Sequence, residues 1–142
     1  MPFTGTSRPS VSSSPVRRSL GRSTDGGMQG KRILVVEDNF LLSEVLCVEI
    51  SASEMVPVGP ASRLDEALKL ANEARIDAAL IDVDLGDGIV SFPVCDVLTR
   101  RSVPFLFVTG TRDRIPAKFS AAAVVEKPFN PADLMAALTL LW

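Results

Sequence analysis

The chain has 142 residues, 46% of them hydrophobic and 23% charged, and a formal net charge of −2. This length suits one domain with a hydrophobic core, and no apolar run approaches the roughly 18 residues that a membrane-spanning helix needs. The sequence contains no histidine, which excludes Ser-His and Cys-His catalysis and histidine metal sites. We therefore expect a soluble, cytoplasmic protein whose chemistry uses Asp, Glu or Lys.

Charge is unevenly distributed along the chain. Residues 1–32 carry six basic residues and one acidic residue, a net of +5, whereas the remainder carries nine basic and sixteen acidic residues, a net of −7. Residues 1–30 are rich in Ser, Pro, Gly and Arg and contain few large apolar side chains. We expect them to form a disordered tail before one domain at 31–142. So acidic a domain is poorly suited to bind nucleic acid.

The tail leaves several interpretations open. Its Arg and Ser content with little acid suits a transit peptide, and a true translation start at Met28 is equally compatible with the sequence. In either case residues 1–30 have no function in the mature domain. Alternatively, its positive charge tethers the domain to an acidic partner.

The first half of the domain begins with a strand of β-branched and apolar residues at 31–36, which ends in Glu37-Asp38-Asn39. Asn39 is a suitable cap for a helix over residues 40–51. The apolar side chains of this helix are expected to form a stripe that faces the core: Leu41, Leu42, Val45, Leu46, Val48 and Ile50. A short second strand at 55–58 precedes Pro60 and Ser62, which are start signals for a second helix.

The third strand is the unbroken apolar run Ala78 to Ile81, which is typical of a parallel strand covered on both faces. Asp82 follows it at once, and Gly86 and Gly88 allow a tight turn. Without its neighbours, this segment is equally well explained as an acidic turn after a strand.

The second half of the domain repeats the alternation of helix and strand. A helix is expected over Ile89 to Arg101, and a fourth strand over 103–108 ends in Thr109. Residues 111–120 predict only a weak helix, because Pro116 interrupts it. A fifth strand at 121–125 precedes Glu126 and Lys127, and Asn130 caps a final helix whose inward side chains are Leu134, Leu138 and Leu141.

Five strands alternating with five helices predict an α/β fold, a doubly wound parallel (βα)5 sheet of flavodoxin-like order 2-1-3-4-5. In this order Asp38 and Asp82 become neighbours, with Thr109 and Lys127 on the adjoining strands. Cys47 and Cys95 fall on helices that cover opposite faces. We expect both cysteines to be reduced core residues and no disulfide between them.

Glu37, Asp38 and Asp82 would crowd three negative charges into one pocket. At about 4 Å and an effective dielectric near 20, each close pair repels by roughly 4 kcal/mol, so the cluster needs a cation. Oxygen ligands without histidine favour Mg²⁺ or Mn²⁺. Glu37 and Asp38 are also explained as acids at a helix N-terminus, but that does not explain their coincidence with Asp82. Together with Thr109 and Lys127, these acids suit the formation of an aspartyl phosphate with Asp82 as the nucleophile.

Four motifs follow one another at strand ends: Val-Val-Glu37-Asp38-Asn, Leu-Ile-Asp82-Val-Asp-Leu-Gly, Val-Thr109-Gly and Lys127-Pro-Phe. In this combination the chain resembles a response-regulator receiver domain from about Lys31 to Trp142. The resemblance implies that Asp38 and Asp82 bind Mg²⁺ directly, that Glu37 does so through water, and that Asp84 offers its backbone carbonyl. It further implies that Thr109 is the switch hydroxyl, that Lys127 pairs with the phosphoryl group, and that the Lys127–Pro128 peptide is cis.

The sequence departs from the receiver pattern in two places. Val124 stands where many receivers have a switch Tyr or Phe, and only eighteen residues separate Thr109 from Lys127, so the fourth helix should be short or irregular. The segment Pro104 to Gly110 is similar to the Phe-Ala-Thr-Gly signature of a group of stand-alone receivers that includes general-stress-response members, with Val108 in place of the Ala.

The resemblance implies a single-domain response regulator of a two-component phosphorelay, a signalling protein and not an enzyme. Its partners would be a histidine kinase or histidine phosphotransferase and a downstream protein, with no nucleic acid and no membrane. Two alternatives remain. Asp82-Val83-Asp84 also occurs in phosphatases of the haloacid dehalogenase type, in which the second Asp is the acid-base group. The fold could also act as a binding module that ignores phosphate.

Overall fold

The computed structural model describes residues 27–142. Most of the predicted tail therefore lies outside the described residues. Of its last residues, Met28 packs against the core, and the Gly30 N–H donates to the Glu54 carbonyl at 2.9 Å.

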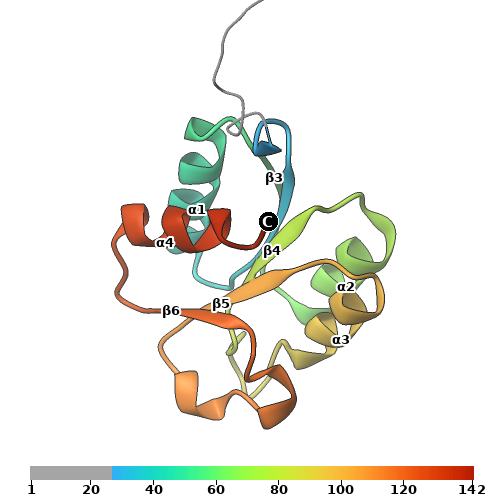
Figure 1. Ribbon diagram of the computed structural model, residues 1–142. Coiled ribbons are helices and arrows are strands. Elements are labelled where there is room, and N and C mark those ends of the chain that lie inside the picture. Colours follow the sequence, from blue (N-terminus) through green and yellow to red (C-terminus); the bar gives the residue numbers. More distant parts are fainter. Residues whose placement is uncertain (1–26) are drawn as a thin grey trace, which may run out of the picture.

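Five parallel strands form one sheet (Figure 1): β2 (Arg32–Val36), β3 (Val56–Ala61), β4 (Ala78–Ile81), β5 (Phe105–Thr109) and β6 (Ala123–Glu126). Their order in the sheet is β3-β2-β4-β5-β6, which confirms the predicted order 2-1-3-4-5 and the flavodoxin-like fold. β2 and β4 lie side by side at the centre, with Val36 opposite Ile81 in the register. The residues that follow these two strands therefore leave the sheet at the same edge.

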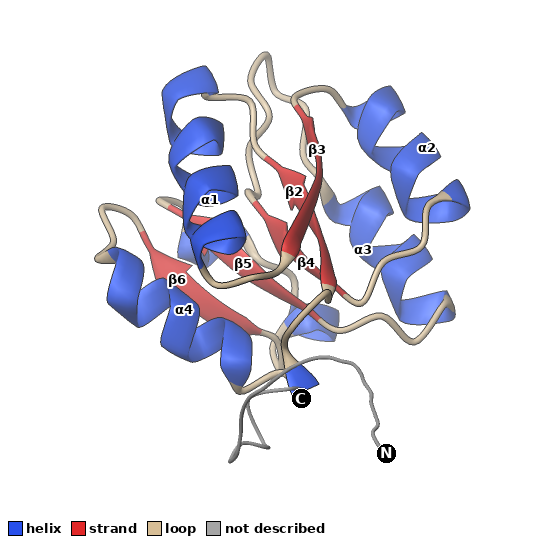
Figure 2. Ribbon diagram, turned by 90° about the horizontal axis from the view of Figure 1, so that it is seen from above, coloured by secondary structure: helices blue, strands red, loops and turns tan. Residues whose placement is uncertain are grey.

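Four α-helices cover the sheet: α1 (Phe40–Ala52), α2 (Leu64–Glu73), α3 (Phe92–Arg100) and α4 (Pro131–Thr139). α1 and α4 lie on one face, and α2 and α3 lie on the other (Figure 2). Alternate residues of each strand point to opposite faces, so each face has its own core. Ile33 and Val35 of β2 pack with Leu46 and Leu134 on the α1–α4 side, whereas Leu34 packs toward α2 and α3.

The expected helix at residues 111–120 is not an α-helix. The segment forms two short 3-10 turns, at Arg112–Arg114 and Ala117–Phe119. Pro116 lies between them in extended conformation and has no N–H to continue a helix. The prediction of five helices was therefore wrong in number, while the expectation of a short or irregular segment here was correct.

Two helices begin later in the structure than the sequence predicted. Pro60 was expected to signal a helix but lies inside β3, and α2 begins only at Leu64. The helix expected from Ile89 begins at Phe92, because Val90 forms an antiparallel bridge with Asp84. Ser91 then precedes the helix, and Pro93 lies in its first turn as predicted.

The predicted core-facing stripe of α1 is wrong in part. Ser43, Leu46 and Ile50 are the buried residues of the helix. Four apolar side chains instead face solvent, and we call them the α1 apolar surface: Phe40 (73% exposed), Leu41 (75%), Val45 (43%) and Val48 (62%). Apolar residues surround almost the whole helix, and the sheet can cover only one side of it.

Cys47 lies on the α1 side and Cys95 is buried on the α3 side, and both are free, as predicted. Within residues 27–142, none of the helices has the length and apolar character that a membrane span requires.

Candidate functional site

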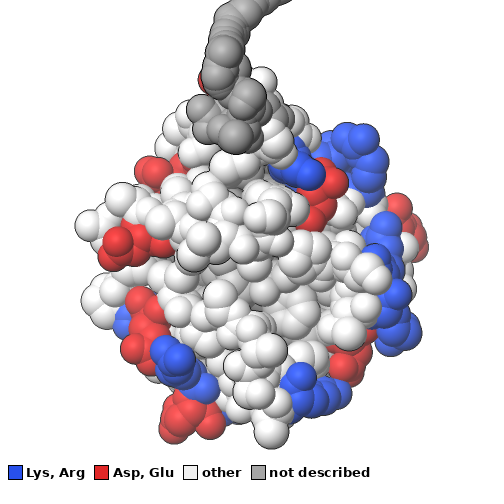
Figure 3. Space-filling model, viewed as in Figure 1, with Lys and Arg blue, Asp and Glu red and all other residues white. Residues whose placement is uncertain are grey.

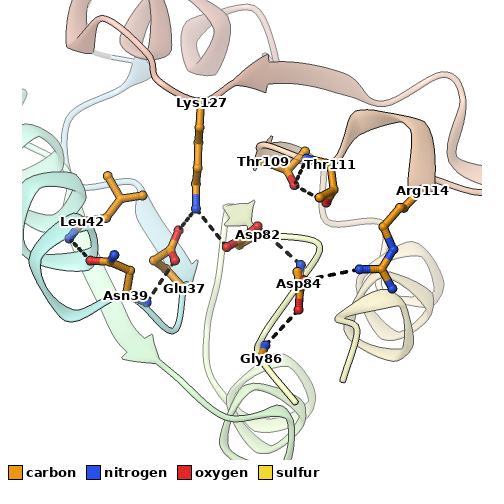
Figure 4. Close-up of polar contacts among 10 residues, drawn as sticks. All are labelled: Glu37, Asn39, Leu42, Asp82, Asp84, Gly86, Thr109, Thr111, Arg114 and Lys127. Atoms are coloured by element: carbon orange, nitrogen blue, oxygen red, sulfur yellow. Dashed lines mark hydrogen bonds and ion pairs between the residues drawn. The ribbon is translucent and has the colours of Figure 1, made fainter. Parts of the chain in front are cut away.

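The carboxyl ends of four strands bring the predicted site residues together, and Figure 4 draws all of them except Asp38. Glu37 and Asp38 follow β2, and Asp82 follows β4. Thr109 ends β5, and Lys127 directly follows β6. The peptide bond from Lys127 to Pro128 is cis, as the resemblance implied.

Lys127 bridges two carboxylates that are 45 residues apart in the sequence. Its Nζ donates to Asp82 Oδ2 at 2.9 Å and to Glu37 Oε1 at 2.8 Å. Burial alone would lower the pKa of the Lys127 ammonium, but the hydrogen bonds to Glu37 and Asp82 outweigh this and raise its pKa above the usual value. The side chain is therefore a permanent cation in the site at neutral pH.

Glu37 is 2% exposed and lies beneath the pocket. Burial, assisted by the nearby negative charge of Asp82, raises the pKa of Glu37 to about 7. The Lys127 ammonium and the Asn39 N–H, which donates to Oε2 at 3.0 Å, act in the opposite direction. Burial of the charged form prevails, so this carboxyl takes up a proton near neutral pH.

The three acids converge at one side of the pocket. Glu37, Asp38 and Asp82 each place one carboxylate oxygen within 4.8 Å of the others. A Cβ added to Gly86, which has φ +90°, would lie 3.3 Å from Asp38 Oδ2, so glycine lets this loop approach the carboxylate closely. All donors are oxygen atoms, which fits a hard divalent cation such as Mg²⁺.

A pocket of about 300 Å³ opens above the acids and is lined by Asp38, Asp82, Asp84, Gly86, Thr109, Gly110, Thr111 and Lys127. Asp82 is 6% exposed at its floor. While Oδ2 of Asp82 is held by Lys127, Oδ1 has only a long 3.4 Å contact from the Asp84 N–H.

The Thr109 hydroxyl is engaged locally and not with the acids. Its Oγ1 accepts the Thr111 N–H at 3.1 Å and lies 3.0 Å from Thr111 Oγ1. Thr109 is fully buried. The structure thus places Thr109 at the pocket but turns its hydroxyl toward its own loop.

Asp84 uses both carboxylate oxygens in contacts at the pocket rim. Oδ1 accepts the Gly86 N–H at 2.9 Å, and Oδ2 lies 3.3 Å from Arg114 Nη1. Sequence reasoning did not assign Arg114 or Thr111 to the site. The Thr-Gly-Thr spacing at 109–111 was an available signal for Thr111, whereas no local pattern indicates that Arg114 reaches back to Asp84.

A larger apolar groove of about 490 Å³ lies elsewhere, between the starts of β5 and β6 and the end of α4. Figure 3 shows mostly uncharged side chains on this side, over α4 and β6. Lys118 is the only ionisable residue among the described residues that line the groove, and it already pairs with Asp96. The chemistry therefore belongs to the smaller acidic pocket.

In a comparison with protein families, the sequence pattern of the response regulator receiver domain matches residues 33–139. Since this match spans most of the chain, the chain belongs to the response regulator receiver domain family.

Two solved structures with the same fold illustrate the similarity. SdrG from Sphingomonas melonis Fr1 is 32% identical, with a TM-score of 0.70, and the match covers 80% of this chain and 97% of SdrG. The response regulator PhyR from Brucella abortus is 25% identical, with a TM-score of 0.70 and coverage of 84% of this chain but 52% of PhyR, so the chain spans about half of PhyR.

The non-phosphorylated HemR receiver domain from Leptospira biflexa is also similar, at 26% identity and a TM-score of 0.68, over 78% of this chain and 93% of that domain. No curated protein sequence matches the chain significantly.

Proposed function

We propose that the protein is a single-domain response regulator of a two-component phosphorelay, which accepts a phosphoryl group on Asp82 and signals by protein contact. The observation that carries the proposal is the Lys127 bridge. One ammonium holds Asp82 Oδ2 at 2.9 Å and Glu37 beside it, at the floor of an open pocket with Asp38 at its rim. The match of the receiver-domain family to residues 33–139 supports the receiver part of the proposal.

The reaction would transfer a phosphoryl group from a phosphohistidine to the Asp82 carboxylate. An oxygen of Asp82 forms the new bond to phosphorus while the phosphorus–nitrogen bond breaks, and the imidazole keeps the bonding electron pair. Oδ1 is the better candidate, because Oδ2 is occupied by Lys127. Lys127 then offsets negative charge on the acyl phosphate, and Thr109 offers a hydroxyl once it turns toward Asp82.

Glu37, Asp38 and Asp82 would hold a divalent cation, together with the backbone carbonyl that the receiver resemblance assigns to Asp84. Mg²⁺, when bound, offsets charge on the transferring phosphoryl group. The chain would orient its ligands: Gly86 allows its loop to lie close to Asp38, and the hydrogen bond from Lys127 holds the Asp82 carboxylate at the pocket floor.

Chemical phosphorylation tests the assignment of Asp82. Wild type incubated with Mg²⁺ and acetyl phosphate should gain one phosphoryl group by intact-protein mass spectrometry, and Asp82→Asn should gain none. Asp87→Asn is the matched control, because it removes one acid from the same loop. Asp87 has φ +53°, which Asn tolerates. Equal phosphorylation of Asp82→Asn and wild type would contradict the proposal. Loss of phosphorylation in Asp87→Asn as well as in Asp82→Asn would also contradict it, because the loss would then not be specific to Asp82.

The α1 apolar surface supports a protein as the phosphodonor. It starts at Phe40, two residues after Asp38, so a partner that covers it also borders the pocket. A histidine kinase or histidine phosphotransferase must bring its histidine to this pocket, and Phe40 and Leu41 offer exposed apolar contact area next to it.

No observation favours a haloacid-dehalogenase-type phosphatase, because Gly86 and Arg114 already engage both oxygens of Asp84, the expected acid-base group. A phosphate-independent binding module predicts equal partner affinity for wild type and Asp82→Ala, whereas the proposed function predicts that beryllofluoride changes partner affinity only in wild type.

A further inference from the structure

The apolar groove between the starts of β5 and β6 and the end of α4 is a surface that the proposed function does not use, and we call it the amino-edge groove. It measures about 490 Å³, and Phe105, Phe119, Ala122 and Leu140 are among the residues that line it. Leu140 is 83% exposed. The side of the molecule that Figure 3 shows carries few charges around this region. An apolar surface with so little charge is suited to bind another apolar segment.

The groove is open because β6 lies at the edge of the sheet and has little covering it. Among the described strands β6 pairs only with β5, and none of its four residues is buried. The segment before it forms two 3-10 turns in place of an α-helix, and only Phe119 of the second turn is buried there. The start of β6 and the end of α4 therefore keep apolar surface in contact with solvent.

The described part of the chain begins close to this groove. Met28 and Leu141 both pack against the α1–α4 core, and Leu141 also lines the groove. Figure 1 shows the end of the chain beyond α4 near the start of β2. The seven residues from Leu20 to Gly27 can span up to about 23 Å, whereas a helix is only about 10 Å across. Leu20 can therefore reach past the end of α4 to the groove.

Residues 14–21, which we call the 14–21 segment, have a sequence pattern suited to an apolar groove. Val16 and Leu20 are four residues apart, so they would share one side of a helix. Ser14 and Pro15 before them are typical of a helix start. A helix this short is not stable alone in water. The pattern therefore indicates a segment whose order depends on contact with an apolar surface.

Charge favours contact between the two parts of the chain. Residues 1–26 carry four basic residues and one acidic residue, a net of +3, whereas residues 27–142 carry eleven basic and sixteen acidic residues, a net of −5. Opposite net charges attract over the distance of a Debye length, and salt weakens the attraction. Arg17 and Arg18 would not share the apolar side of the helix with Val16 and Leu20, so they can remain hydrated.

We propose that the 14–21 segment docks in the amino-edge groove of the same molecule, with Val16 and Leu20 in contact with its apolar lining. Because the segment is tethered, its effective concentration at the groove is on the order of 1 mM, so a weak contact is sufficient. Docking excludes other chains from the groove. The inference goes beyond the proposed function and does not depend on it, since the groove lies at the amino ends of the strands and the acidic pocket at their carboxyl ends.

Amide NMR spectra of the full-length chain, recorded without Mg²⁺ or a phosphodonor, test the docking. The double variant Val16→Ser/Leu20→Ser should shift the signals of Ala122 and Leu140 relative to wild type, because the docked side chains are lost. Val11→Ser is the matched control, since it removes an apolar side chain from the same tail outside the segment. Its groove signals should coincide with those of wild type, and wild-type signals should not depend on protein concentration.

Three results in these spectra would overturn the inference. Groove signals that are the same in wild type and the double variant would show that the segment does not dock. An equal shift in Val11→Ser would show that the effect is not specific to residues 14–21. Wild-type groove signals that move with protein concentration would show that a second copy of the chain occupies the groove instead.

A synthetic peptide of residues 12–24 gives an independent measurement. It should bind the Val16→Ser/Leu20→Ser variant with a Kd of about 1 mM or tighter, and bind wild type at least about threefold more weakly, because the tethered segment competes. Adding Leu140→Ser to the double variant should weaken the peptide at least about threefold, and the fold should tolerate this change of an exposed side chain. No binding to the double variant, or equal binding to it and to wild type, would refute the docking while leaving the assignment of Asp82 untouched.

Discussion

Glu37 carries the clearest pH dependence of any single residue in the site. Its folded pKa of about 7 lies above the ordinary value of 4.5, because burial disfavours the charged form. The folded state therefore binds more protons than the unfolded state between these pH values, and stability falls as pH rises through this window. At about 1.4 kcal/mol per pKa unit, the full cost above pH 7 is about 3 kcal/mol.

Glu37→Gln should remove this cost. Urea unfolding without divalent cations should show the free energy of unfolding of wild type declining, relative to the variant, from pH 4.5 to pH 7 and remaining constant at pH 8. A difference between the two proteins that does not change with pH would show that Glu37 ionises in the folded protein as it does in the unfolded chain.

The residues at strand ends were predictable from the sequence, and those that act across loops were not. Asp82 follows an apolar strand directly, and its meeting with Asp38 and Lys127 follows from strand order alone. Arg114 approaches Asp84 only because the segment after β5 folds as short turns, which no residue periodicity encodes. The direction of the Thr109 hydroxyl likewise depends on how the loop places Thr111, which no residue periodicity encodes.

Among the elements, α1 shows why hydrophobic periodicity was insufficient. The helix is apolar around most of its circumference, so the pattern could not identify the side that packs. The sheet covers Leu46 and Ile50 and leaves Leu41, Val45 and Val48 in solvent. Similarly, Pro60 favours a helix start by type, but the pairing of β2 with β3 places it inside a strand.

The α1 apolar surface leads to a prediction about this element. Leu41→Ser should leave the free energy of unfolding within about 0.5 kcal/mol of wild type, because Leu41 is 75% exposed. Phosphorylation by acetyl phosphate should be unchanged, while transfer from any histidine kinase that phosphorylates wild type should slow at least about fivefold.

Lys69→Ser, on the far face of the sheet, is a control for surface substitution and should transfer at the wild-type rate. Equal rates for Leu41→Ser and wild type would mean that the kinase docks elsewhere. A matching loss with acetyl phosphate would indicate damage to the pocket itself.

For the whole molecule, alternation of strand and helix was enough to predict the sheet order, because parallel strands need crossovers and these have one hand. The two cores also follow from alternation along each strand. Between β5 and β6, Pro116 and the short spacing predicted a short or irregular segment, but not the two 3-10 turns that it forms.

The contact between Lys31 and Trp142 determines whether tryptophan fluorescence can report on occupancy of the acidic pocket. Trp142 is the sole tryptophan, and its ring centroid lies 5.2 Å from Lys31 Nζ, before the amino end of β2. The acids follow the opposite end of this five-residue strand, about 17 Å away. The fluorescence of wild type should therefore stay constant when Mg²⁺ and beryllofluoride are added. Phe40→Trp should place a second tryptophan near Asp38, and its fluorescence should be quenched as beryllofluoride binds. A saturable change of the Trp142 signal would instead reveal that occupancy of the pocket is sensed at the far end of the sheet.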